Sequence, residues 1–140
     1  MNSFEMEPRT SVLGIGVDIV ETARIQASIG RFGDRFLGRV FTQGERDYCG
    51  SMPFPERHYA ARFAAKEAVS KAFGTGIGRQ AGWRDIEIKR KESGEPYILL
   101  HGAAAELAAT LNVLQALISL SHSDHYSVAN AILIARAQAA

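Results

Sequence analysis

Hydrophobic and polar residues alternate with a period of two from Val12 to Val20, which is the pattern of a β-strand. One side of this strand carries large apolar residues, and we expect it to face the core: Leu13, Ile15, Val17 and Ile19. The other side carries Asp18 together with Gly14 and Gly16. Because glycine in a strand often marks the close approach of a ligand or another backbone, we expect the glycines to leave open space in front of Asp18. The alternative is an aspartate that caps the following helix.

An alanine-rich stretch without proline or internal glycine predicts a helix over residues 62–73 that ends at Gly74. One face is a stripe of small side chains suited to close packing: Ala60, Ala64, Ala68 and Ala72. A second face carries the donors Arg62, Lys66 and Ser70, and an adjacent row carries Phe63, Glu67 and Lys71. The alternative is an ordinary amphipathic helix with a Glu67–Lys71 surface pair, worth only about 0.2–0.5 kcal/mol.

The remaining segments predict short helices and two hairpins. Helices are expected over residues 22–30, in two brief turns around Gly33 and Gly38, after a capping box at Thr42–Glu45, and over 103–111 with Asn112 as its stop. Strands are expected over 85–90 and 96–101, and over 117–121 and 126–135. This order predicts an α+β fold, with a mostly antiparallel sheet packed against a long central helix and shorter helices.

Composition limits the classes of protein to which this chain can belong. Its 140 residues are 46% hydrophobic and 22% charged, which is typical of a globular domain. We expect a flexible tail over residues 1–11, which lacks the apolar run of a secretory signal, and a single domain over residues 12–140. The net charge of +1 argues against a general nucleic-acid binder. No stretch approaches the roughly 18 apolar residues of a membrane-spanning helix, so we expect no membrane partner.

Cysteine and arginine usage add two further expectations. The single cysteine, Cys49, excludes an internal disulfide and a cysteine-built zinc site, so a reducing cytoplasm fits best. Arginines gather in the segment after the first strand, including Arg24, Arg31 and Arg35. This basic patch is either a solvated face or a landing site for an acidic protein.

Asp18 and Glu67 are two carboxylates that could share a cation. Magnesium usually takes one or two protein carboxylates, and waters and substrate phosphates complete its coordination. Arg62, Lys66 and Lys71 would then meet those phosphates, and the amides of the turn Gly74-Thr75-Gly76 could hold another. His122 lies where a strand meets a tight turn; it is either held by its neighbours there or part of the site.

Three motifs together resemble the holo-acyl-carrier-protein synthases. They are Gly14–Glu21 followed by Arg24-Ile25, then Arg62–Gly76, and then Ser121-His122-Ser123 with Tyr126 and Ala129. They stand in the family's order across residues 12–135, in a chain of the short, single-unit type. The resemblance implies the 4'-phosphopantetheinyl transferase fold. It also implies a reaction in support of fatty acid biosynthesis, in which the 4'-phosphopantetheine arm of coenzyme A moves to a serine of apo-acyl carrier protein and adenosine 3',5'-bisphosphate is released.

By the same resemblance, Asp18 and Glu67 hold magnesium, and Lys66 lies beside the diphosphate as the third catalytic residue. Eight residues are expected to bind coenzyme A: Arg62, Lys66, Ser70, Lys71, Gly74, Thr75, Gly76 and His122. The acyl carrier protein is expected to contact Arg24, Arg31 and Arg35. Family members are typically homotrimers with sites shared between subunits.

Several alternatives remain open from the residues alone. The general base is Glu67 or a magnesium-bound water near Asp18. Lys71 either contacts a phosphate or pairs with Glu67. A non-catalytic coenzyme A or nucleotide-binding module is the rival function, and a structural trimer whose glycine face only packs against a neighbour is another.

Overall fold

The computed structural model describes residues 9–137, which form five helices longer than one turn and two antiparallel sheets. In chain order the elements are β1 (Thr10–Glu21), α1 (Thr22–Phe32), α2 (Asp34–Val40), α3 (Gln43–Ser51), α4 (Pro55–Ala72), the 3-10 helix η1 (Trp83–Asp85), β2 (Ile86–Arg90), β3 (Pro96–Leu100), α5 (Gly102–Thr110), β4 (Val113–His122) and β5 (Tyr126–Arg136). The predicted α+β class is confirmed.

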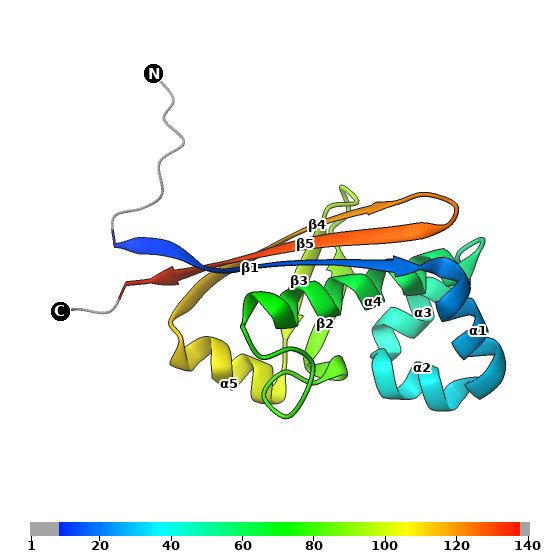
Figure 1. Cartoon of the computed structure of the whole chain (residues 1–140), viewed down its shortest axis with the longest axis horizontal. Coiled ribbons are helices and arrows are strands. Elements are labelled where there is room, and N and C mark those ends of the chain that lie inside the picture. The colour runs from blue at the N-terminus through cyan, green and yellow to red at the C-terminus, as the bar shows by residue number, and fades with distance from the viewer. Residues whose placement is uncertain (1–8, 138–140) are drawn as a thin grey trace, which may run out of the picture.

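The larger sheet has the strand order β1-β5-β4, and α4 runs along one of its faces (Figure 1). The helices α1, α2 and α3 gather at one end of α4, and α5 lies toward the other. In the register of this sheet Asp18 pairs with Ala129, which pairs on its other side with Leu120. The hairpin β2–β3 forms a separate sheet.

Local sequence signals set most of the element boundaries. The capping box at Thr42 and Glu45 is present at the start of α3, and Asn112 has the positive φ of a helix stop. The two brief helical turns predicted around Gly33 and Gly38 were wrong in part, because Gly38 lies inside the single helix α2. β1 begins at Thr10, so the predicted tail over residues 1–11 overlaps this strand; its first eight residues lie outside the described part of the chain.

The core lies between α4 and the inner face of the larger sheet. Small side chains dominate the contact, with Ala64, Ala68, Ala129 and Ala131 fully buried. The predicted inward side of β1 was wrong: Ile15, Val17 and Ile19 are 68%, 55% and 62% exposed on the outer face, and Leu13 is exposed beside them. The glycine side faces α4 instead. No helix within residues 9–137 combines the length and apolar character needed to cross a membrane.

Candidate active site

Gly14 and Gly16 bring β1 against the backbone of α4. A Cβ added at Gly16 would stand 1.8 Å from the carbonyl oxygen of Ala68, and one added at Gly14 would stand 1.9 Å from that of Ala72. The predicted close-packing role of the alanine stripe is therefore confirmed. The open space expected in front of Asp18 was wrong, because α4 fills it. The two glycines instead allow the helix to pack closely on the strand.

This packing places Asp18, Glu67 and Lys71 together. Lys71 Nζ lies 2.9 Å from a carboxylate oxygen of Asp18 and donates to the carbonyl oxygen of Val17. The Asp18 side chain is 16% exposed and that of Lys71 is 49% exposed, so the group opens to solvent. Asp18 does not cap the following helix, because Glu21 occupies the N-cap position of α1. Lys71 thus pairs with Asp18 across elements, where a surface pair with Glu67 was one alternative.

The electrostatics of Glu67 reflect a second carboxylate nearby. Partial burial, and then the negative charge of Asp18, raise the pKa of Glu67, while the Lys71 ammonium opposes this shift. A carboxylate whose charge is disfavoured by a neighbouring carboxylate forms a site that a cation stabilises. Within residues 9–137 no group of three or more His, Cys, Asp or Glu side chains gathers as a metal site, so a cation here would have two protein carboxylates.

Lys66 and Ser70 occupy a different side of α4, and the predicted contact of these two residues with coenzyme A was wrong. Lys66 is fully buried, pairs with Glu45 at 2.7 Å and donates to the carbonyl oxygens of Trp83 and Ile86. All three ammonium donors are thereby used. Burial lowers the pKa of Lys66, although Glu45 favours its charge. Ser70 is also fully buried, and its hydroxyl donates to the carbonyl oxygen of Glu67.

Arg62 lies at a hollow on the α3 side of α4. Its guanidinium stacks 4.4 Å from the centre of the Tyr48 ring, and its Nε has no hydrogen-bond partner among residues 9–137. The hollow has a volume of about 470 Å³ and is lined by Tyr48, Arg62, Glu87 and the β2–β3 turn. A buried polar atom without a partner beside an open hollow is suited to an anionic ligand.

His122 is exposed at the end of β4 and lies close enough to His58 to influence that side chain. Burial, and then the charges of Arg62, His122 and Arg90, lower the pKa of His58. Arg57 reaches across to Asp124 in the β4–β5 turn, at 3.5 Å. The structure thus brings the predicted pair Arg62 and His122 into one region, although Asp18, Glu67 and Lys71 face a different side of α4.

The glycine turn after α4 closes the helix. Gly74 and Gly76 have φ of +83° and +68°, which glycine adopts without strain. The amide of Gly74 donates to the carbonyl oxygen of Lys71, and the amides of Thr75 and Gly76 donate to that of Ser70. The predicted amide cradle was therefore wrong for these three amides, because each donates its proton to α4. Contact of the turn with coenzyme A by other atoms stays a prediction.

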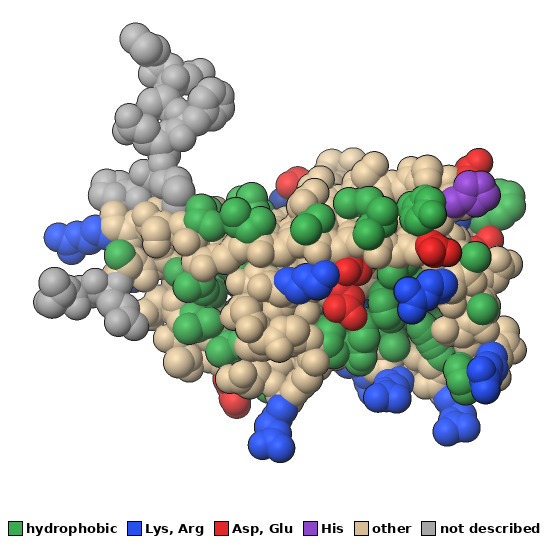
Figure 2. Space-filling view, viewed as in Figure 1, with side chains coloured by type: hydrophobic (Ala, Val, Ile, Leu, Met, Phe, Trp, Pro, Cys, Tyr) green, Lys and Arg blue, Asp and Glu red, His purple; other side chains and the backbone are tan. Residues whose placement is uncertain are grey.

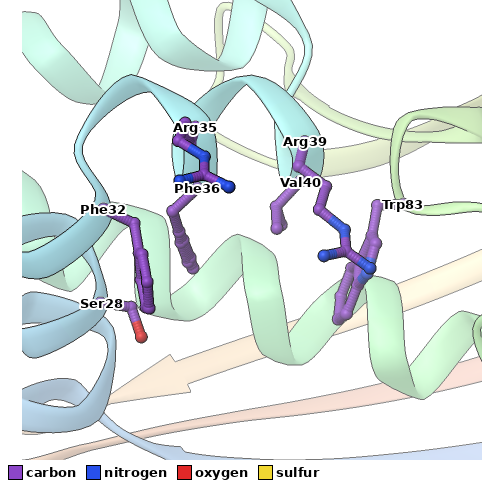
Figure 3. A pocket seen from close by; sticks show the side chains of 7 residues that line it. All are labelled: Ser28, Phe32, Arg35, Phe36, Arg39, Val40 and Trp83. Atoms are coloured by element: carbon purple, nitrogen blue, oxygen red, sulfur yellow. The ribbon is translucent and has the colours of Figure 1, made fainter.

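The predicted carrier-binding arginines are exposed on α1 and α2, where basic side chains project from the surface (Figure 2). Beside them is a hollow of about 440 Å³. Figure 3 shows Phe32, Phe36 and Trp83 lining it together with Arg35 and Arg39. An apolar hollow edged by arginines is suited to a partner with an acidic and partly apolar surface.

Sequence reasoning missed Glu45 as more than a capping residue. Its carboxylate is fully buried and accepts hydrogen bonds from the amides of Thr42 and Ile88 as well as from Lys66. The capping-box spacing predicted the bond between Glu45 and Thr42. The bonds to Lys66 and Ile88 join segments distant in the sequence, so no local pattern could reveal them.

Comparison with known proteins identifies the family. Residues 14–131 match the model of the 4'-phosphopantetheinyl transferase superfamily. The chain belongs to this superfamily.

Individual phosphopantetheinyl transferases resemble the chain over nearly their whole length. A holo-[acyl-carrier-protein] synthase of Koribacter versatilis is 49% identical over 122 residues, which cover 87% of this chain and 98% of the relative. The crystal structure of the synthase from Neisseria meningitidis matches with a TM-score of 0.83 at 32% identity, and covers 88% of this chain and 98% of that one. The Helicobacter pylori synthase in complex with coenzyme A matches with a TM-score of 0.76 at 33% identity, and covers 85% of this chain and 98% of that one.

Proposed function

We propose that this protein is a magnesium-dependent holo-acyl-carrier-protein synthase. It transfers the 4'-phosphopantetheine arm of coenzyme A to a serine of apo-acyl carrier protein. The observation that carries this proposal is the group formed by Asp18, Glu67 and Lys71 at the contact of β1 with α4. The names of the relatives, and the coenzyme A bound to the Helicobacter pylori synthase, support the choice of substrates.

The residues present fit a magnesium ion. Asp18 and Glu67 offer two oxygen ligands, and the raised pKa of Glu67 marks a place where added positive charge is favourable. Asp18 and Glu67 would hold the ion, and Lys71, already at Asp18, would meet a phosphate oxygen of the coenzyme A diphosphate. When bound, magnesium supplies positive charge to the non-bridging oxygens of that diphosphate.

The reaction moves one phosphoryl group. The carrier serine oxygen forms a bond to the phosphorus next to the pantetheine arm, and the bond from this phosphorus to the bridging oxygen breaks. Adenosine 3',5'-bisphosphate leaves with that oxygen. Glu67 is the base that we propose accepts the serine proton. Lys71 stabilises the negative charge that grows on the phosphate oxygens.

The adenosine end of coenzyme A binds in the hollow beside Arg62, with His122 nearby for the 3'-phosphate. This assignment is supported by the cationic surroundings of the hollow and the unpartnered Nε of Arg62. Because Arg62 and Glu67 face different sides of α4, the carboxylates of one chain and the hollow of a neighbouring chain together would complete a site.

We propose that the protein is a homotrimer for this reason and for a second one. The outer face of β1 exposes Ile15, Val17 and Ile19, and Leu117 of β4 is also exposed. Figure 2 shows hydrophobic side chains spaced along the strands of this sheet. A row of exposed apolar side chains of this kind marks a protein interface.

The acyl carrier protein docks on α1 and α2. Arg24, Arg31 and Arg35 attract its acidic surface and raise the encounter rate at low salt.

The product supplies fatty acid biosynthesis in the cytoplasm. The single cysteine, Cys49, is free and buried, which fits this reducing compartment. Burial raises the pKa of its thiol to about 11, so the thiol stays protonated.

The intact mass of an apo-acyl carrier protein tests the proposal. After incubation with this protein, coenzyme A and magnesium, we expect a gain of one phosphopantetheine arm that a chelator abolishes. Asp18→Ala and Glu67→Ala should each abolish the gain while the fold remains. If a panel of carriers gains no mass although coenzyme A binds, the protein is a binding module and the proposed reaction is wrong.

A further inference from the structure

Glu45 and Lys66 form a fully buried ion pair, and neither belongs to the group proposed to react. Both side chains have no exposed surface, and their charged atoms lie 2.7 Å apart. Lys66 comes from α4 and is followed directly by Glu67, whose carboxylate faces Asp18 on another side of the helix. The buried pair and the reactive carboxylate thus share one turn of α4.

Glu45 connects three elements through one carboxylate. One oxygen accepts from Lys66 of α4 and from the amide of Thr42 at the start of α3. The other oxygen accepts from the amide of Ile88 in β2, 2.9 Å away. Because both oxygens accept, glutamine cannot replace Glu45 without turning an amide donor toward another donor. The position of α4 is therefore coupled to that of α3 and β2.

Stability alone does not account for a buried pair of this kind. Replacing a buried ion pair with apolar groups is often neutral or stabilising, because desolvation costs as much as the attraction provides. The α4–β1 seam consists of alanine and glycine, which fix how closely the two elements approach. Such short side chains offer little to resist a small rotation of the helix. Three directed hydrogen bonds from Lys66 supply that resistance.

We propose that Glu45 and Lys66 are positioning residues that act through α4. They hold the helix at the rotation at which Lys71 meets Asp18 and Glu67 lies beside them. The kinetic part of this inference rests on the proposed function, and the geometric part does not.

The crystal structure of the Glu45→Leu/Lys66→Met double variant, in which apolar groups replace the pair, tests the geometric part. Removing both charges avoids leaving one of them buried and unpaired. We expect Lys71 Nζ to move from 2.9 Å to beyond about 4 Å from the Asp18 carboxylate, the usual limit of an ion pair. An unchanged contact would overturn the proposal. So would failure of both this variant and Glu45→Asp to fold, because the pair would then serve stability alone.

Kinetics of carrier modification test the consequence. In the folded double variant we expect kcat to fall about a hundredfold, as for a catalytic group displaced by about 1 Å. The KM for carrier should stay within about twofold, because the docking arginines lie on α1 and α2. Adding Lys71→Ala to the double variant should cost far less than adding it to the wild type. Equal costs in the two backgrounds would overturn the proposal.

A surface variant and the wild-type protein serve as controls for the positioning role. Glu106→Gln removes an exposed glutamate of α5 and should leave kcat unchanged. A wild-type protein that modifies no carrier would refute the proposed function, while the Lys71–Asp18 distance in the variant crystal would still decide the positioning role.

Discussion

Replacing Gly16 with alanine should move Asp18 on β1 away from Glu67 and Lys71 on α4. The new Cβ would stand 1.8 Å from the Ala68 carbonyl oxygen, 2.8 Å from its carbonyl carbon and 2.9 Å from the Ala72 nitrogen. All three are backbone atoms of α4, so no side chain can rotate away. Ordinary contact begins at 3.4 Å, so strand and helix must part by about 1.6 Å (3.4 minus 1.8).

This separation has two consequences of different size. Overpacking a well-packed contact costs about 1–3 kcal/mol, which for a chain of this length lowers the melting temperature by roughly 2–12 °C. Gly16 lies two residues before Asp18, and Ala68 follows Glu67 directly. Because a displacement of about 1 Å can cost a hundredfold in rate, we expect kcat to fall by at least that factor.

Thermal unfolding by circular dichroism and carrier modification followed by intact mass measure the two effects. Gly30→Ala in α1 is the matched control, because a Cβ there meets nothing within 4 Å and its φ is not positive. This control should keep full activity and gain up to about 1 kcal/mol of stability from helix propensity. If Gly16→Ala melts within about 1 °C of the wild type and retains its kcat, the close-packing argument is wrong.

Three further predictions concern charge and assembly. Glu67→Gln should raise the melting temperature of the metal-free protein at neutral pH, because the pKa of Glu67 is raised in the folded state. A group with a raised folded-state pKa contributes stability below its unfolded pKa, and this stability is lost as pH rises through the folded pKa. The advantage of glutamine should therefore vanish as pH falls toward 4.5, and an advantage that grows on acidification would contradict this sign. Arg24→Glu should raise the KM for carrier and weaken its dependence on salt with little change in kcat, measured between low and moderate ionic strength; an unchanged KM would refute this docking face. Ile15→Glu places a charge on the exposed apolar face, so sedimentation should give a monomer that has lost transfer, whereas an intact trimer would rule out this face as the interface.

The sequence by itself determined most of the local structure. Alternation placed β1, the Thr42 capping box started α3, and the turn at residues 92–95 joined β2 to β3. Each signal works because it reports backbone hydrogen bonding within a few residues. The resemblance of three motifs pointed to the family that the comparisons establish. Residue spacing also brought forward Asp18 and Glu67, which the fold places together.

Tertiary structure decided which sides of these elements face inward. Alternation in β1 separates Ile15 and Val17 from Gly14 and Gly16, but both an apolar and a glycine-lined side can be covered. In this chain α4 needs a close approach to β1, so the glycines face the helix and the large apolar residues face outward. Likewise, the 3.6-residue repeat distinguishes the row of Lys66 from that of Glu67, yet only the contact of Lys66 with Glu45, across 21 positions, turns Lys66 into the core.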